Sequence, residues 1–191
     1  MHRLLFAIAL LLVILVWGPV GTAGGKAVNA SLTIDGSEWE GDDDLVRWAI
    51  SRFVVAELDP PAVNVAFHDE IGACAGHPGL YRDQPSPRID ICGFANISTA
   101  SKRTTLHELA HAWAHENLTD NDIDKFLRMR RLDTWAGPHA PWELRGSEHA
   151  AEIISWALFD RELELVTIPN ADMEATEASY RLLTGKSLPH R

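Results

Sequence analysis

Cysteine is scarce in this sequence, and positive charge is nowhere gathered into a cluster. Cys74 and Cys92 are the only cysteines among 191 residues, which is too few for a zinc site built from thiolates. The chain has no Lys/Arg cluster and no Gly-rich phosphate loop, and its formal net charge is −10. Because nucleic-acid binding relies on neutralising phosphates, these absences argue against a nucleic-acid partner. Internal repeats and low-complexity tracts are also lacking, and the length suggests one domain.

The first 23 residues have the pattern of a secretory signal peptide. A short basic start, Met1–Arg3, precedes an unbroken apolar run of 14 residues from Leu4 to Trp17. Gly18-Pro19 ends the run, and the small residues 21–23 suit a signal peptidase. The alternative is an uncleaved membrane anchor, which would need about 20 apolar residues and therefore an extension of the run to Ala23. We expect a secreted or extracytoplasmic protein that contacts a membrane only if this segment is retained.

An exported chain with two cysteines favours a disulfide between Cys74 and Cys92. The alternative is two unpaired, buried thiols. Residues 24–41 read as a flexible leader, and residues 42–191 as a single domain large enough to bury its own core.

Hydrophobic periodicity and turn residues predict an α+β domain: a short β-sheet followed by a helix at 102–116 and a helical C-terminal part. Residues 68–87 and 134–146 carry several Gly and Pro residues and are predicted to be loops. Ser147 is the expected cap of the fourth helix, and Thr119 or Asp120 that of the third. The predicted helices are 43–57, 102–116, 121–132, 147–160 and 171–183, and the predicted strands are 62–67 and 88–94.

The stretch TTLHELAHAW contains the pattern H-E-x-x-H, with His107, Glu108 and His111. On a helix, residues four apart share one face, so both imidazoles can reach one metal ion. Glu108 would lie beside the ion, where a carboxylate can take a proton from metal-bound water. At this composition, the probability that the pattern occurs by chance is small but not negligible. The prediction therefore depends on a third ligand.

Glu148 is the best third ligand, since it begins a second helix whose surface is mostly apolar. A buried carboxylate needs a partner, and Glu152, one turn on, could accept the Nδ1–H of a liganding histidine. His115 shares the face of His107 but lies about 12 Å along the helix, too far for one ion. The histidines His139 and His149 remain alternative third ligands.

HELAH followed by SEHAAE resembles the gluzincins, the thermolysin-like zinc peptidases, and in particular their small secreted bacterial members. The resemblance covers only residues 107–158. It implies one Zn²⁺ per chain on His107, His111 and Glu148, with Glu108 as the general base and peptides or proteins as substrates. Glu152 stands where thermolysin carries Asp, and its longer side chain could exchange roles with Glu148.

The implied reaction is peptide-bond hydrolysis by a zinc-activated water, with Glu108 returning the proton to the leaving amine. The substrate would lie extended against a sheet edge, for which strand 88–94 is the expected strand. His139 ranks first as donor to the oxyanion, ahead of His149, Arg145 and Tyr180. Trp135 and Trp142 are interpreted as packing residues first and substrate contacts second.

Two other functions fit the same residues. One is a secreted zinc-binding module without turnover, used for adhesion or partner binding. The other is a metallohydrolase of different fold with a histidine as third ligand. An intact Glu108 argues against the first, because a structural site has no use for a base.

Overall fold

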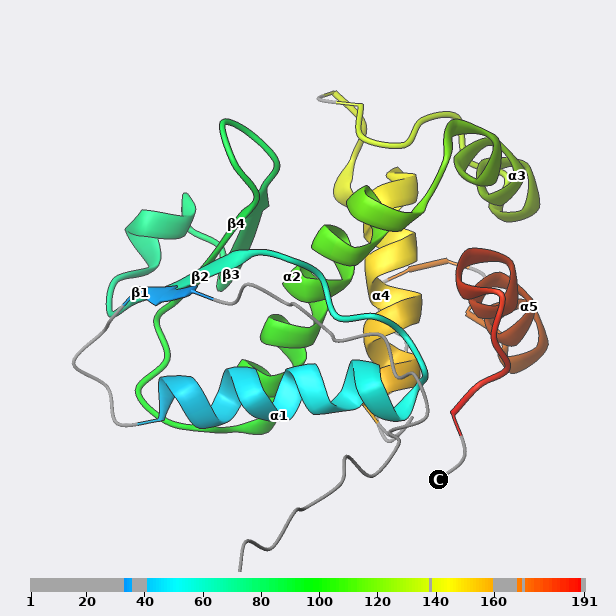
Figure 1. Ribbon diagram of the computed structural model, residues 1–191. Helices are drawn as coiled ribbons and strands as arrows, with labels where there is room; N and C mark the ends of the chain where they lie inside the picture. The colour runs from blue at the N-terminus through cyan, green and yellow to red at the C-terminus, as the bar shows by residue number, and fades with distance from the viewer. Residues whose placement is uncertain (1–32, 36–40, 138, 160–167, 170, 190–191) are drawn as a thin grey trace, which may run out of the picture.

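The computed structural model describes residues 33–35, 41–137, 139–159, 168–169 and 171–189. Over these residues the fold is α+β, as the sequence predicted, with a four-stranded sheet and five α-helices (Figure 1). The proposed signal segment, residues 1–23, lies outside the described residues, as does most of the proposed leader. No helix in the described part of the chain has both the length and the apolar character needed to span a bilayer.

The sheet has the strand order β1-β2-β4-β3. Strand β2 pairs in parallel with β1 and with β4, whereas β3 runs antiparallel to β4. The strands are β1 (Thr33–Asp35), β2 (Asn64–His68), β3 (Gly79–Arg82) and β4 (Arg88–Cys92).

Two predictions about the sheet were wrong. β3 occupies part of the expected loop 68–87, and β1 occupies part of the expected leader. The predicted strand 88–94 exists as β4, but it pairs on both sides and is not the expected edge; the edges are β1 and β3, of which β3 lies beside α2.

The helices agree with the sequence to within a few residues at each end. Ser98 and Thr119 cap α2 and α3 through reciprocal side-chain hydrogen bonds. Ser147 does not cap the fourth helix as predicted, because that helix already begins at Gly146 after Arg145. The helices are α1 (Asp42–Val55), α2 (Thr99–Asn117), α3 (Asp120–Arg130), α4 (Gly146–Leu158) and α5 (Met173–Thr184), with short 3₁₀ helices η1 (Ile71–Cys74) and η2 (Trp142–Leu144).

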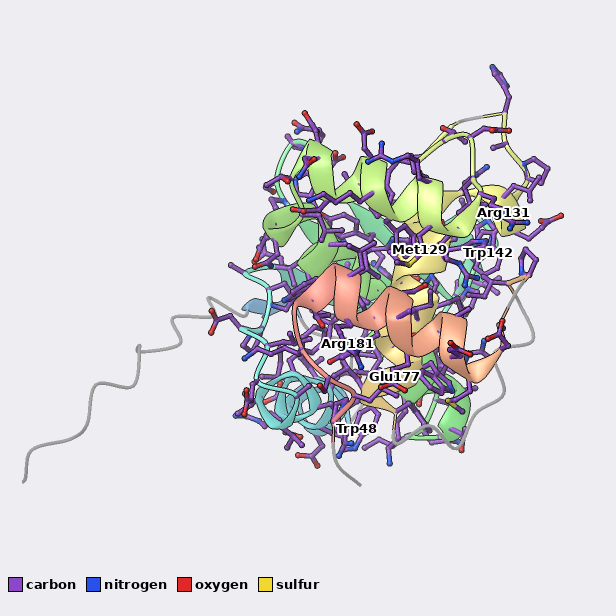
Figure 2. All side chains as sticks on the ribbon, turned by 90° about the vertical axis from the view of Figure 1, so that its right-hand side faces the viewer. Trp48, Met129, Arg131, Trp142, Glu177 and Arg181 are labelled. Carbon is purple, nitrogen blue, oxygen red and sulfur yellow. A yellow bond between two sulfur atoms is a disulfide. The ribbon has the colours of Figure 1, made fainter. Side chains whose placement is uncertain are left out.

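Helix α2 lies between the sheet and α4, and α3 and α5 cover the far side of α4 (Figure 1). Seen from that side, α3 and α5 lie next to one another across α4 (Figure 2). Every residue of α4 from His149 to Leu158 is buried, which confirms that the apolar surface of this helix is internal. Two central helices are thereby fixed against each other by a shared core.

The predicted disulfide is present and links Cys74 at the end of η1 to Cys92 at the end of β4. It encloses the segment that contains the edge strand β3. The covalent link therefore holds β3 beside β4 in addition to the backbone hydrogen bonds between the two strands.

Candidate metal centre and its base

Helix α2 presents the two histidines of the motif on one face. Leu106, Leu109 and Ala110 are fully buried in the core, whereas the rings of His107 and His111 are only partly covered. The centroids of the two rings lie 4.7 Å apart. The predicted spacing on a helical face is thus confirmed: four residues of helix bring both rings to one point.

The first turn of α4 brings Glu148 to the same point. Its Oε2 lies 3.1 Å from His107 Nε2 and 3.1 Å from His111 Nε2, and the two Nε2 atoms are also 3.1 Å apart. These three side chains form a group that could hold a metal ion. Burial would raise the pKa of Glu148, but its hydrogen bonds to the two histidines outweigh burial, so its pKa is well below the usual range.

Glu152 lies behind His107, one helical turn beyond Glu148. Its Oε1 is 3.5 Å from His107 Nδ1, on the opposite side of the ring from Glu148. Arg103, one turn before His107 on α2, donates to both oxygens of Glu152 at 3.3 and 3.1 Å. A proton on His107 Nδ1 would therefore face a carboxylate and leave the Nε2 lone pair directed at Glu148. The structure thus places Glu148, and not Glu152, in the group with both histidines.

Glu108 is enclosed between α2 and the edge strand β3. Glu108 is only 7% exposed, and the backbone N–H of Tyr81 faces its carboxylate closely enough to lower its pKa. Burial raises the pKa of Glu108 to about 7; the Glu148 charge adds to this rise, whereas His111 and the Tyr81 N–H oppose it. A carboxylate in this environment can exist in either protonation state near neutral pH.

The register of β3 determines which of its backbone groups face Glu108. The N–H of Cys92 donates to the C=O of Pro78 at 2.9 Å, so the pair Gly79↔Ile91 is one that exchanges no hydrogen bonds of its own. Alternation along the antiparallel pair makes Tyr81↔Ile89 a second such pair. The backbone polar groups of Gly79 and Tyr81 therefore point away from β4, toward the open edge of the sheet.

No protein-family model, curated protein or solved structure matches this chain. The chemistry of the site must therefore be inferred from its own residues. Their arrangement combines three metal-ligand side chains from two helices with one buried carboxylate beside them.

The other proposed site residues lie elsewhere. His149 is fully buried and uses both ring nitrogens: Arg130 Nε donates to Nδ1 at 3.3 Å, and Nε2 contacts the Glu143 carbonyl oxygen at 2.8 Å. Tyr180 is fully buried in the core on α5. Arg145 donates from Nε to the Ala140 carbonyl, and His139 is exposed on the loop before η2. The proposal of His139 as oxyanion donor stays a prediction.

Two aromatic rings flank the histidine pair. Trp142, 36% exposed on η2, stacks near His107 with ring centroids 6.1 Å apart. Tyr81 stacks near His111 with centroids 6.3 Å apart. Trp135 instead packs edge-on against the buried Phe126. The interpretation of Trp135 as a packing residue is confirmed, whereas Trp142 lies beside the site.

Sequence reasoning missed Gly79, Tyr81 and Arg103. Each reaches the site through contact between elements far apart in the chain. Gly79 and Tyr81 were assigned to a loop because His77-Pro78-Gly79 has the composition of a turn. A tyrosine flanked by apolar and charged residues after that turn was the one local indication of a short strand.

Proposed function

We propose that this protein is a zinc-dependent metallopeptidase of the gluzincin type. One observation carries the proposal: His107 Nε2, His111 Nε2 and Glu148 Oε2 converge at 3.1 Å from one another, with Glu108 buried beside them. Two histidines and one glutamate are a ligand set of catalytic zinc sites, which leave a further coordination position open.

The spacing of these atoms suits a zinc ion. Ligand atoms at 2.0–2.1 Å from zinc in a tetrahedral arrangement are about 3.3 Å apart, close to the 3.1 Å found between each pair here. The donors are two imidazoles and one carboxylate, which zinc accepts, whereas calcium and magnesium prefer oxygen alone. The residues present therefore fit zinc.

When bound, such an ion supplies a Lewis acid that polarises the scissile carbonyl and makes water a stronger acid. Glu108 takes the proton of the attacking water and delivers it to the nitrogen of the leaving amine. The Tyr81 N–H, which faces the Glu108 carboxylate, favours its ionised form. Glu152 orients the ring of His107 through Nδ1, as carboxylates do for metal-binding histidines.

A peptide in extended conformation is the substrate that this site suits best. β3 is an edge strand beside α2, and the backbone groups of Gly79 and the carbonyl of Tyr81 face outward. An extended chain can add to such an edge by backbone hydrogen bonds and so pass the histidines. Trp142 offers an exposed ring at the other side of His107 for a substrate side chain.

The alternatives have less support. A purely structural zinc site is closed by four protein ligands, and the group found among the described residues consists of three. A histidine as third ligand is disfavoured because His149 has both nitrogens engaged and His139 is exposed on a loop.

Metal analysis of purified variants tests the ligand set. We expect one zinc per chain in the wild type, and at least a tenfold loss of zinc affinity in His111→Ala and in Glu148→Ala. His115→Ala is the matched control for the first variant, because this exposed histidine lies one turn further along α2. Glu174→Ala, in the first turn of α5, is the control for the second. Full zinc binding by Glu148→Ala would point to a histidine as third ligand.

A further inference from the structure

A residue without a side chain, Gly79 of β3, lies against Glu108. A Cβ added to Gly79 would lie 2.6 Å from Glu108 Oε1, 2.7 Å from Glu108 Cγ and 2.7 Å from Thr104 Cγ2. These separations are well inside van der Waals contact for carbon, about 3.5–4.0 Å. The edge strand therefore lies directly against the side chain of Glu108, and only glycine permits this approach.

We propose that Gly79 is the positioning residue of Glu108, acting together with the backbone N–H of Tyr81. The inference rests on the proposed function, in which Glu108 is the base. Gly79 limits where the carboxylate can go, and the Tyr81 N–H fixes the direction in which it points. Both residues belong to the same edge strand, two positions apart, so their Cβ directions share one face of the sheet, while the Tyr81 N–H points away from β4.

A methyl group added at position 79 would meet two side chains of α2, those of Glu108 and Thr104. Thr104 lies one turn before Glu108 on α2, and a β-branched side chain in a helix has little rotamer freedom. The backbone of β3 is paired to β4. Just before β3, the Pro78 carbonyl accepts a hydrogen bond from the Cys92 N–H. A methyl group at position 79 would therefore displace the Glu108 side chain, and the contact with Thr104 Cγ2 would be relieved only by a small shift between β3 and α2.

The contact between Gly79 and Glu108 involves none of the proposed metal ligands. Those ligands come from α2 and α4, whereas β3 is held by β4 and by the Cys74–Cys92 disulfide. A substitution at position 79 should therefore lower turnover without changing zinc affinity. A general loss of structure would lower both.

The first test compares Gly79→Ala with Gly72→Ala in zinc-loaded protein. Gly72 lies in the neighbouring η1, and an added Cβ there has nothing within 4 Å. We expect Gly79→Ala to lose at least tenfold in kcat on a peptide substrate, with zinc affinity unchanged and KM changed less than kcat. Gly72→Ala should match the wild type. Equal kcat in Gly79→Ala and wild type would overturn the proposal.

A double-mutant comparison separates positioning from a structural role. If Gly79 acts through Glu108, then Gly79→Ala should have no further effect on kcat once Glu108→Gln is present. If the double variant instead shows the product of the two single losses in kcat, Gly79 affects turnover by another route, which would contradict the inference.

Amide hydrogen exchange supplies a readout that needs no turnover. The Tyr81 N–H should be protected in the wild type and exchange faster in Gly79→Ala, whereas the Leu80 N–H, which faces Asp90, stays protected. If Gly79→Ala does not fold, Glu108→Ala removes the acceptor without a clash and should expose the same amide. An unchanged Tyr81 amide in both variants would defeat the inference. Absence of hydrolysis by the wild type, with the exchange differences present, would defeat only the proposed function.

Discussion

Asp90 on β4 is a buried acidic residue with three charged or titratable partners. The residue is 1% exposed, and its carboxylate accepts hydrogen bonds from His68 at 2.7 Å, from Arg88 Nε at 2.9 Å and from Arg82. Burial would raise the pKa of Asp90, but the hydrogen bonds to His68 and Arg88 and the two arginine charges lower it overall. Because these partners lie on β2, β3 and β4, one carboxylate holds three strands together.

A pH-dependent stability loss should follow from Asp90. A carboxylate whose folded pKa is depressed contributes stability above its unfolded pKa of about 3.9, and that contribution is lost as the pH falls through the folded value. We predict that Asp90→Asn lowers the free energy of unfolding by about 2 kcal/mol at pH 7. The difference from wild type should shrink at pH 3 and below.

Urea unfolding at pH 7 and at pH 2.5 measures this difference. Asp83→Asn is the control, because Asp83 is exposed just after β3. A gap between Asp90→Asn and wild type that is equally large at both pH values would show that the charge of Asp90 has no part in the effect.

Part of the site could be predicted residue by residue. His107, Glu108 and His111 follow from helical spacing, and Glu148 and Glu152 follow from the acidic positions on an otherwise apolar helix. Gly79 and Tyr81 could not be predicted, because their relevance depends on how closely β3 approaches α2. Such a distance is set by packing between distant segments and leaves no periodic pattern.

The start of α4 is fixed by its close approach to α3 and to the preceding loop. A Cβ on Gly146 would lie 2.6 Å from Leu127 Cδ2, 2.9 Å from Trp135 Cε3 and 3.3 Å from the Thr134 carbonyl oxygen. The Gly146 N–H also donates to that carbonyl at 2.9 Å. Glu148 lies in the same turn, so these contacts help to place it.

Gly146→Ala should destabilise the protein by about 1–3 kcal/mol, the usual cost of overpacking. The thermal midpoint and the urea midpoint both measure the change, with Gly72→Ala as the unhindered control. We expect zinc affinity to fall as well, because the first turn of α4 carries Glu148. A Gly146→Ala protein as stable as the wild type would mean that α4 can shift freely at its start.

At the scale of elements, the sequence located the helices better than the sheet. Helices α1 to α5 have amphipathic or buried runs of 11 to 19 residues. β3 has four residues and follows Pro78, and β1 has three, too few for a period of two to stand out. The strand order was also not predictable, because hydrogen-bonding partners are chosen by long-range pairing.

The disulfide acts on the whole molecule by closing a loop with a sequence separation of 18 residues. Loop-closure entropy for this length corresponds to about 3 kcal/mol of stability. Thiol counting on denatured, unreduced protein should find no free thiol, and reduction should lower the free energy of unfolding by that order. Two titratable thiols in the unreduced protein would contradict the covalent link.

The α+β class follows from the order of the predicted elements. The packing of α2 against α4 follows from the apolar faces of these two helices. The meeting of these two helices is what assembles the proposed active centre, since each alone carries an incomplete ligand set.

The most direct test of the central claim compares peptide hydrolysis by wild type and Glu108→Gln at equal zinc content. Glutamine keeps the size of Glu108 but cannot accept a proton, and a general base contributes about 10²–10⁴-fold. We predict that the zinc-loaded wild type cleaves an unfolded protein or a broad peptide library, that a chelator stops it, and that Glu108→Gln binds zinc normally but is slower by at least 10²-fold. A zinc-loaded wild type that cleaves nothing, or a Glu108→Gln variant that cleaves as fast, would contradict the account.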